Sequence, residues 1–163
     1  GAFTEEAVRK MAELNEKPAI MPISNPTKLA EAKATDLIKW TDGRALVVTG
    51  SPSEPIEHNG VTYTIGQANN ALLYPGLGLG IIVAKAKIVS DGMLSAAAHG
   101  IASLQDFSKT GAAILPSVEK VREASKLVAI AVVKQAIKEG LNRIEIVDVK
   151  KAVEDSIWEP IYK

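Results

Sequence analysis

Over the first 70 residues, the apolar positions alternate between helical spacing and short continuous runs. Helical spacing covers Phe3–Leu14, where the Thr4 hydroxyl can cap the first turn, and it returns over the shorter segment Ala34–Trp40. Two apolar runs, Ala19–Ile23 and Ala45–Thr49, predict buried strands. Helices that alternate with buried strands are typical of a parallel, doubly wound sheet, so we predict an α/β fold.

The pattern changes at Asn70, after which helical spacing prevails. Before that point a hairpin is predicted between Ile56 and Tyr63, because Asn59-Gly60 is a favoured sequence for a two-residue type I′ turn. Two strands are too few for a doubly wound sheet, so we expect the remaining strands before Gly1. After Asn70 we expect four helices: over Gly76–Val89, after the cap Ser90, over Val118–Glu139 and from near Asp148.

Composition narrows the class of protein. Nineteen Lys and Arg balance nineteen Asp and Glu, so nothing favours nucleic acid or an anionic membrane as a partner. The absence of cysteine excludes disulfides and thiolate metal sites. The longest apolar stretch contains Lys85 and Lys87 and is shorter than a membrane span, and the first residues lack the features of a signal peptide. We therefore expect a cytoplasmic protein, and the chain does not begin with Met.

Polar residues that could bind a ligand lie at the ends of the two predicted strands and just before Asn70. The first strand leads into Ser24-Asn25-Pro26-Thr27, and the second ends in Thr49-Gly50-Ser51-Pro52. In open α/β sheets, ligands bind outside the carboxyl ends of the strands. The amides of Gln67, Asn69 and Asn70 precede a helix, where neutral donors and the helix start can hold a small anion. These segments look like one rim of a nucleotide cleft; the alternative is that the Asn residues only form a turn.

Three stretches of this sequence resemble a known family: SNPT at 24–27, TDGRALVVTGSP at 41–52 and GQANNALLYPGLGLG at 66–80. They are similar to the C-terminal third of malic enzymes and look closest to the bacterial malolactic branch. The resemblance implies a Rossmann-like doubly wound NAD-binding domain, of which residues 1–69 are the C-terminal portion. It further implies that residues 70–141 are helices returning to the catalytic domain and that residues 142–163 form a C-terminal helical tail.

Enzymes of this family decarboxylate L-malate with NAD and Mn²⁺ or Mg²⁺. The resemblance implies that the general base, the proton donor and the metal ligands lie before Gly1, so we expect no catalytic residue and no metal ligand here, and an inactive isolated chain. Asn25 and Asn70 match substrate-binding positions and are expected to converge on the dicarboxylic acid. Positions matching the cofactor side are Ser24, Gly50, Ser51 and Asn69, although small residues at strand ends also serve packing and turns.

Three functions follow from these observations. The first is a malolactic enzyme, which converts L-malate to L-lactate and CO₂; the second is an NAD-dependent malic enzyme, which forms pyruvate, CO₂ and NADH. The third is a non-enzymatic α/β interaction module. A homo-oligomer is expected, because the helices after Asn70 should expose an apolar face. Gly76, Gly78 and Gly80 resemble part of the GxGxxG dinucleotide fingerprint, but Ile81 and Val83 stand where its last glycine would fall. No strand precedes them either, so we expect these glycines to serve close helix packing.

Overall fold

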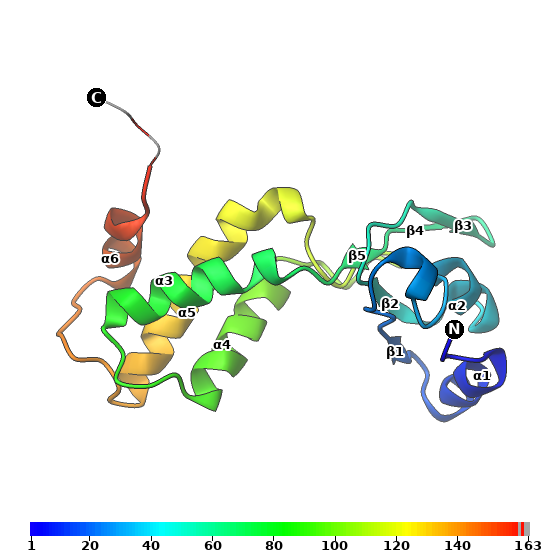
Figure 1. Cartoon of the computed structure of the whole chain (residues 1–163), viewed down its shortest axis with the longest axis horizontal. Coiled ribbons are helices and arrows are strands. Elements are labelled where there is room, and N and C mark those ends of the chain that lie inside the picture. The colour runs from blue at the N-terminus through cyan, green and yellow to red at the C-terminus, as the bar shows by residue number, and fades with distance from the viewer. Residues whose placement is uncertain (160, 162–163) are drawn as a thin grey trace. The chain divides into compact units, whose positions relative to one another are not determined.

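The computed structural model describes residues 1–159 and 161. These form two compact units, the first made of residues 1–69 and 105–117 and the second of residues 70–104 and those from 118 onward. The first unit contains α1 (Glu5–Leu14), β1 (Ala19–Ile20), the 3₁₀ turn η1 (Thr27–Leu29), α2 (Ala34–Trp40), β2 (Leu46–Thr49), β3 (Ile56–His58), β4 (Val61–Tyr63) and β5 (Gly66–Gln67) (Figure 1). The second contains η2 (Asn70–Leu72), α3 (Tyr74–Ala84), α4 (Asp91–Ala102), η3 (Val118–Lys120), α5 (Val121–Lys138) and α6 (Val149–Ser156).

A three-stranded parallel sheet in the order β1-β2-β5 organises the first unit. Ile20 pairs with Val47, and Thr49 pairs with Gln67, so the carboxyl ends of the strands meet at one edge. The predicted strands and the α/β class are confirmed, but β1 ends at Ile20 and not at Ile23. Pro22 follows and has no N–H group to continue the ladder, which accounts for the shorter strand.

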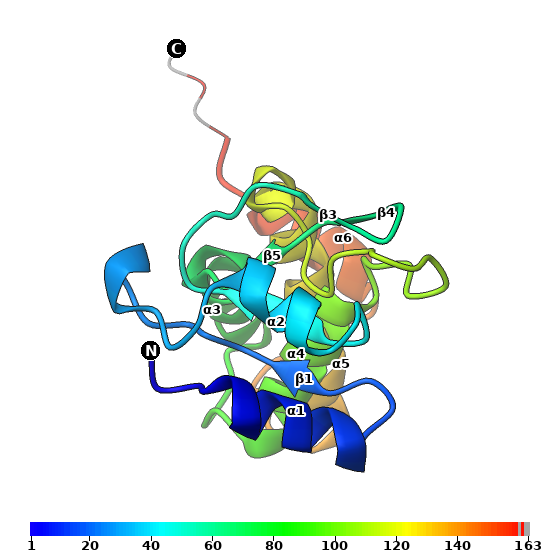
Figure 2. The ribbon, with the colours of Figure 1, turned by 90° about the vertical axis from the view of Figure 1, so that its right-hand side faces the viewer.

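Helices α1 and α2 cover one face of this sheet with a shared apolar core. Figure 2 shows α1, α2 and β1 of this unit, and α2 packs against both α1 and β2. The Thr4 hydroxyl accepts a hydrogen bond from the Ala7 N–H at 3.3 Å, which confirms the predicted cap. The buried residues of this core are Val8, Ile20, Ala34, Leu37, Ile38, Ala45, Val47 and Tyr63.

The hairpin β3–β4 turns at Asn59 and Gly60, whose φ angles of 50° and 75° are both positive. A type I′ turn requires this geometry, so the predicted hairpin is confirmed. Residues 105–117 also belong to the first unit, and the Thr64 N–H donates to the Gly111 carbonyl at 2.8 Å. That return of the chain to the sheet unit was not part of the sequence prediction.

In the second unit, α3 and α4 both pack against the long helix α5. The predicted helices are present, with caps at Ser90 and Asp148. However, α3 ends at Ala84 and not at Val89, because Lys85 adopts a left-handed conformation with φ 47°. The Ala86 N–H then bonds the Ile81 carbonyl, as expected for a helix that closes with a left-handed residue.

Helices α3 and α5 approach closely where α3 carries glycine. A Cβ built on Gly76 would lie 2.5 Å from the Ser125 carbonyl oxygen, and one on Gly80 would lie 2.8 Å from the Val132 Cβ. Gly78 faces open space, with nothing within 4 Å of such a Cβ. The packing interpretation is therefore confirmed for Gly76 and Gly80 and wrong for Gly78.

Candidate functional site

The carboxyl ends of the three parallel strands bring the first-unit candidate residues together. Beyond β1 and β2 the backbones stay joined, since the Gly50 N–H donates to the Pro22 carbonyl at 3.1 Å. On the other side of β2, the Gln67 amide donates to the Gly50 carbonyl at 3.2 Å, and the Ala68 N–H donates to the Thr49 carbonyl at 2.8 Å. A ligand outside this sheet edge would meet loops from three strands at once.

Asn25 and Ser51 are directly linked across this edge. The Ser51 hydroxyl donates to the Asn25 side-chain oxygen Oδ1 at 2.6 Å. The Thr49 hydroxyl in turn donates to the Ser51 backbone carbonyl at 2.8 Å, which holds the loop after β2. Asn25 is exposed and Ser51 is half-buried, so the pair lies where a bound molecule can reach it.

Ser24 is held by a residue that the sequence analysis missed, Glu31. Both the Ser24 backbone N–H and its hydroxyl donate to the Glu31 carboxylate, at 3.2 and 2.7 Å. These bonds, the hydroxyl one foremost, lower the pKa of Glu31 below its ordinary value, because they favour the ionised carboxylate. A lone glutamate in the loop between β1 and α2 belongs to no repeating pattern, so nothing in the sequence pointed to this contact.

Gly50 is required here by backbone packing. A Cβ at this position would fall on the Ile23 carbonyl, only 2.6 Å from its carbon atom. The loops after β1 and β2 can therefore approach each other only with glycine at position 50. This packing role stands beside the cofactor-side role expected from the resemblance.

Asn69 and Asn70 lie on either side of the division between the two units. Asn69 is the last residue of the first unit before the chain enters the second, where Asn70 begins η2. The Asn70 backbone carbonyl accepts from the Leu73 N–H at 3.1 Å, so this residue opens the turn that leads into α3.

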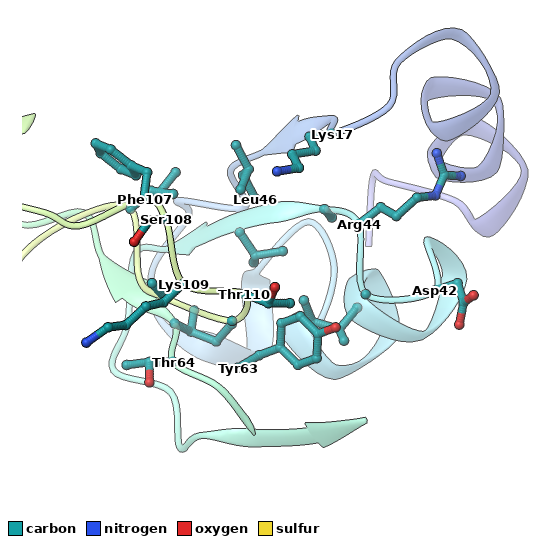
Figure 3. Close-up of a pocket in the computed structure, with 18 of the residues that line it drawn as sticks. Lys17, Asp42, Arg44, Leu46, Tyr63, Thr64, Phe107, Ser108, Lys109 and Thr110 are labelled. Carbon is teal, nitrogen blue, oxygen red and sulfur yellow. The ribbon is translucent and has the colours of Figure 1, made fainter. Parts of the chain in front are cut away.

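The first unit also contains a cavity of about 440 Å³ at the opposite ends of its strands (Figure 3). Leu46, which begins β2, lines it together with Tyr63 of β4 and Phe107 of the returning loop. Arg44, also in the lining, donates to the Ala12 carbonyl at 2.8 Å and so closes the end of α1. None of the predicted site residues lines this cavity.

The described residues include no cluster of side chains suited to bind a metal ion. Across residues 1–159 and 161, no group of three or more His, Cys, Asp or Glu side chains could hold an ion. Within the same range, no helix has both the length and the apolar character needed to cross a membrane.

Small polar residues at the ends of parallel strands are expected of a nucleotide-binding domain, and a family of known sequences agrees. Residues 1–137 match the family described as "Malic enzyme, NAD binding domain". This chain belongs to the malic enzyme family. The resemblance of the three motifs is thereby confirmed, as is the assignment of an NAD-binding domain.

The relatives of this chain within the malic enzyme family include both malic enzymes and malolactic enzymes by name. The chain is 56% identical over 163 residues to "NAD-dependent malic enzyme 3" of Bacillus subtilis, covering all of the chain and 29% of that protein. It is 54% identical over 163 residues to the "Malolactic enzyme" of Lactiplantibacillus plantarum, covering all of the chain and 30% of that protein. The chain thus spans less than a third of the length of these relatives.

A solved structure supports the same family. The malic enzyme from Pyrococcus horikoshii matches with a TM-score of 0.76 and 27% identity, over 96% of this chain and 31% of that one. The Entamoeba histolytica malic enzyme has the same TM-score at 22% identity over 96% of this chain and 29% of that one, and shows the fold alone. The α/β architecture described above is therefore the one found in malic enzymes.

Proposed function

We propose that the protein carrying this chain is an NAD-dependent enzyme that decarboxylates L-malate, and that this chain supplies part of the NAD site and part of the malate site. The observation that carries the proposal is the Ser51–Asn25 pair at the carboxyl edge of a parallel sheet, within a chain of the malic enzyme family. Such an edge is where open α/β sheets bind their ligands. Family membership also favours an enzyme over a non-enzymatic interaction module.

In this proposal Asn25 and Asn70 bind the carboxylates of malate. A carboxamide donates through Nδ2–H without adding a positive charge, so it orients the substrate and still releases the product. Residues proposed for the cofactor side are Ser24, Gly50, Ser51 and Asn69. Three of them, Ser24, Gly50 and Ser51, are small residues at the strand ends. NAD bound there would accept the hydride from the hydroxyl-bearing carbon of malate.

Two overall reactions are compatible with this site. In the malolactic reaction L-malate gives L-lactate and CO₂ with no net reduction of NAD; we propose this one first, since relatives at 54% and 50% identity are named malolactic enzymes. In the oxidative reaction L-malate and NAD give pyruvate, CO₂ and NADH. The 56% identity to an NAD-dependent malic enzyme favours that alternative. In both reactions Mn²⁺ or Mg²⁺ would polarise the keto oxygen of the substrate. The residues that would bind this metal ion are proposed to lie outside this chain.

The test uses the full-length protein with L-malate, NAD and Mn²⁺. Lactate formed in step with CO₂, without accumulation of NADH, is the result expected for the malolactic reaction. Pyruvate and NADH formed in step with CO₂ would assign the oxidative reaction instead. Absence of any malate-dependent CO₂ release would overturn the proposal. The isolated chain is expected to be inactive in the same assay, because it spans less than a third of the length of its relatives.

A further inference from the structure

We propose that Ser51 is a positioning residue, which fixes the orientation of the Asn25 carboxamide so that its Nδ2–H groups face the substrate carboxylate. This inference rests on the proposed function. It assigns Ser51 a role toward malate, in addition to the cofactor-side role in the proposed function.

The direction of the hydrogen bond carries the first step. The Ser51 Oγ lies 2.6 Å from the Asn25 Oδ1, and between these two atoms the hydroxyl must donate because a carbonyl oxygen only accepts. The oxygen and nitrogen of a carboxamide lie on opposite sides of the same planar group. With Oδ1 turned toward Ser51, the Nδ2 donors of Asn25 are turned away from it.

The second step concerns what those donors contact. Among residues 1–159 and 161, no protein group accepts a hydrogen bond from the Asn25 Nδ2, and Asn25 is exposed. Both N–H groups of this amide are therefore available to a ligand. A carboxylate matches them, since it is an acceptor at both oxygens.

The third step is the rigidity of the groups around the pair. The backbone of Ser51 is held by the Thr49 hydroxyl at 2.8 Å, and the neighbouring Gly50 N–H bonds the Pro22 carbonyl at 3.1 Å. On the other side, Ser24 is held by two bonds to Glu31. Because both loops are fixed, the Ser51 hydroxyl can select one of the two orientations of the amide. The opposite orientation would present Oδ1 to the malate carboxylate, which is repulsive.

The experiment measures malate and NAD kinetics of the full-length enzyme with Ser51→Ala, Ser51→Thr, Asn25→Ala and the double variant Ser51→Ala/Asn25→Ala. Ser53→Ala is the matched control, because Ser53 lies in the same loop and its hydroxyl contacts only the Glu54 carbonyl at 3.2 Å among described groups. Loss of one hydrogen bond predicts a rise in the KM for malate of about three- to tenfold for Ser51→Ala. Any rise in the KM for NAD, whose site Ser51 also borders in the proposed function, should be smaller than the rise in the KM for malate. The thermal midpoint should stay as in the parent enzyme.

The double variant tests more directly whether Ser51 acts through Asn25. If Ser51 acts through Asn25, the double variant should lose no more affinity for malate than Asn25→Ala alone. Ser51→Thr, which retains a hydroxyl, should restore most of the affinity. Ser51→Cys keeps the side-chain volume but donates weakly, and it replaces Ser51→Ala if that variant does not fold.

Several outcomes would overturn the inference while leaving the proposed function intact. These are a Ser51→Ala effect on NAD alone, additive losses in the double variant, or a malate KM equal to that of Ser53→Ala. By contrast, a parent enzyme that binds no malate would remove the proposed function itself, so the two failures are distinguishable.

Discussion

The Glu31 carboxylate holds Ser24 in the loop after β1. It accepts from the Ser24 N–H at 3.2 Å and from the Ser24 hydroxyl at 2.7 Å, and these bonds lower its pKa from the ordinary 4.5. A group with a lowered pKa in the folded protein stabilises it at pH values above its unfolded pKa. That contribution is lost as the pH falls through the lowered value.

An NMR titration of the Ser24 amide tests this. We expect its chemical shift to change with a midpoint below 4.5, since deprotonated Glu31 is the acceptor of that N–H. In Glu31→Gln, which cannot titrate, the same signal should stay constant over this pH range. A midpoint at or above 4.5 in the parent protein would show that Ser24 and Glu31 are not bonded in solution.

Gly50 gives a second prediction at the residue scale. In Gly50→Ala the new methyl group would lie 2.6 Å from the Ile23 carbonyl carbon, so the loops after β1 and β2 must separate. Overpacking of this kind costs about 1–3 kcal/mol of unfolding free energy. Urea unfolding of both proteins measures the difference, and equal midpoints would show that the two loops lie further apart than described.

For single residues, the sequence could predict which of them lie close together but not which hydrogen bonds join their side chains. The ends of parallel strands meet at one edge, which made it possible to group Asn25 with Ser51 before the structure was known. Which atom of the Asn25 amide meets the hydroxyl depends on side-chain rotation, and no sequence pattern records that. Glu31 was missed for another reason, because a single carboxylate in a loop belongs to no repeating pattern.

Among the elements, α3 has the most specific packing requirement. Gly80 lets its backbone approach α5, where a Cβ would lie 2.8 Å from the Val132 Cβ and 2.9 Å from the Ala129 carbonyl oxygen. Gly80→Ala should therefore lower the unfolding free energy, by about 1–3 kcal/mol as for other overpacked positions. Gly78→Ala is the matched control on the same helix, because its Cβ would meet nothing within 4 Å.

The control is expected to change stability in the opposite direction. Alanine in the interior of a helix is favoured over glycine by about 0.5–1 kcal/mol, so Gly78→Ala should raise the thermal midpoint. Thermal unfolding of the three proteins under one condition decides between the two effects. Destabilisation by Gly78→Ala equal to that by Gly80→Ala would mean that both glycines pack against α5.

Elements were predicted where local pattern determines them and missed where distant residues do. The strand β2 forms a continuous apolar run, and the hairpin has its own turn sequence. In contrast, β5 is only Gly66–Gln67 and pairs with β2 through its backbone, so it has no apolar run to detect. The return of residues 105–117 to the sheet unit likewise depends on partners such as Thr64, some fifty residues earlier.

At the scale of the whole molecule, one side of α3 exposes large apolar side chains. This helix contains no charged residue, and a helix that is apolar all round is normally buried on every side. Yet Tyr74 is 58% exposed and Ile82 is 72% exposed. With Gly78 between them at four-residue spacing, they share one face of the helix, which is away from the α5 contact.

An exposed apolar face of this kind favours association. We therefore predict that the isolated chain is larger than its 17.3 kDa monomer in light scattering. Ile82→Glu should shift the measured mass toward the monomer, because a charge on that face must be desolvated in any contact that covers it. Ser95→Glu, which adds the same charge at an exposed position of α4, should leave the mass unchanged. A monodisperse monomer of the unmodified chain would contradict this prediction. An oligomer whose mass Ile82→Glu leaves unchanged would have to form through another surface.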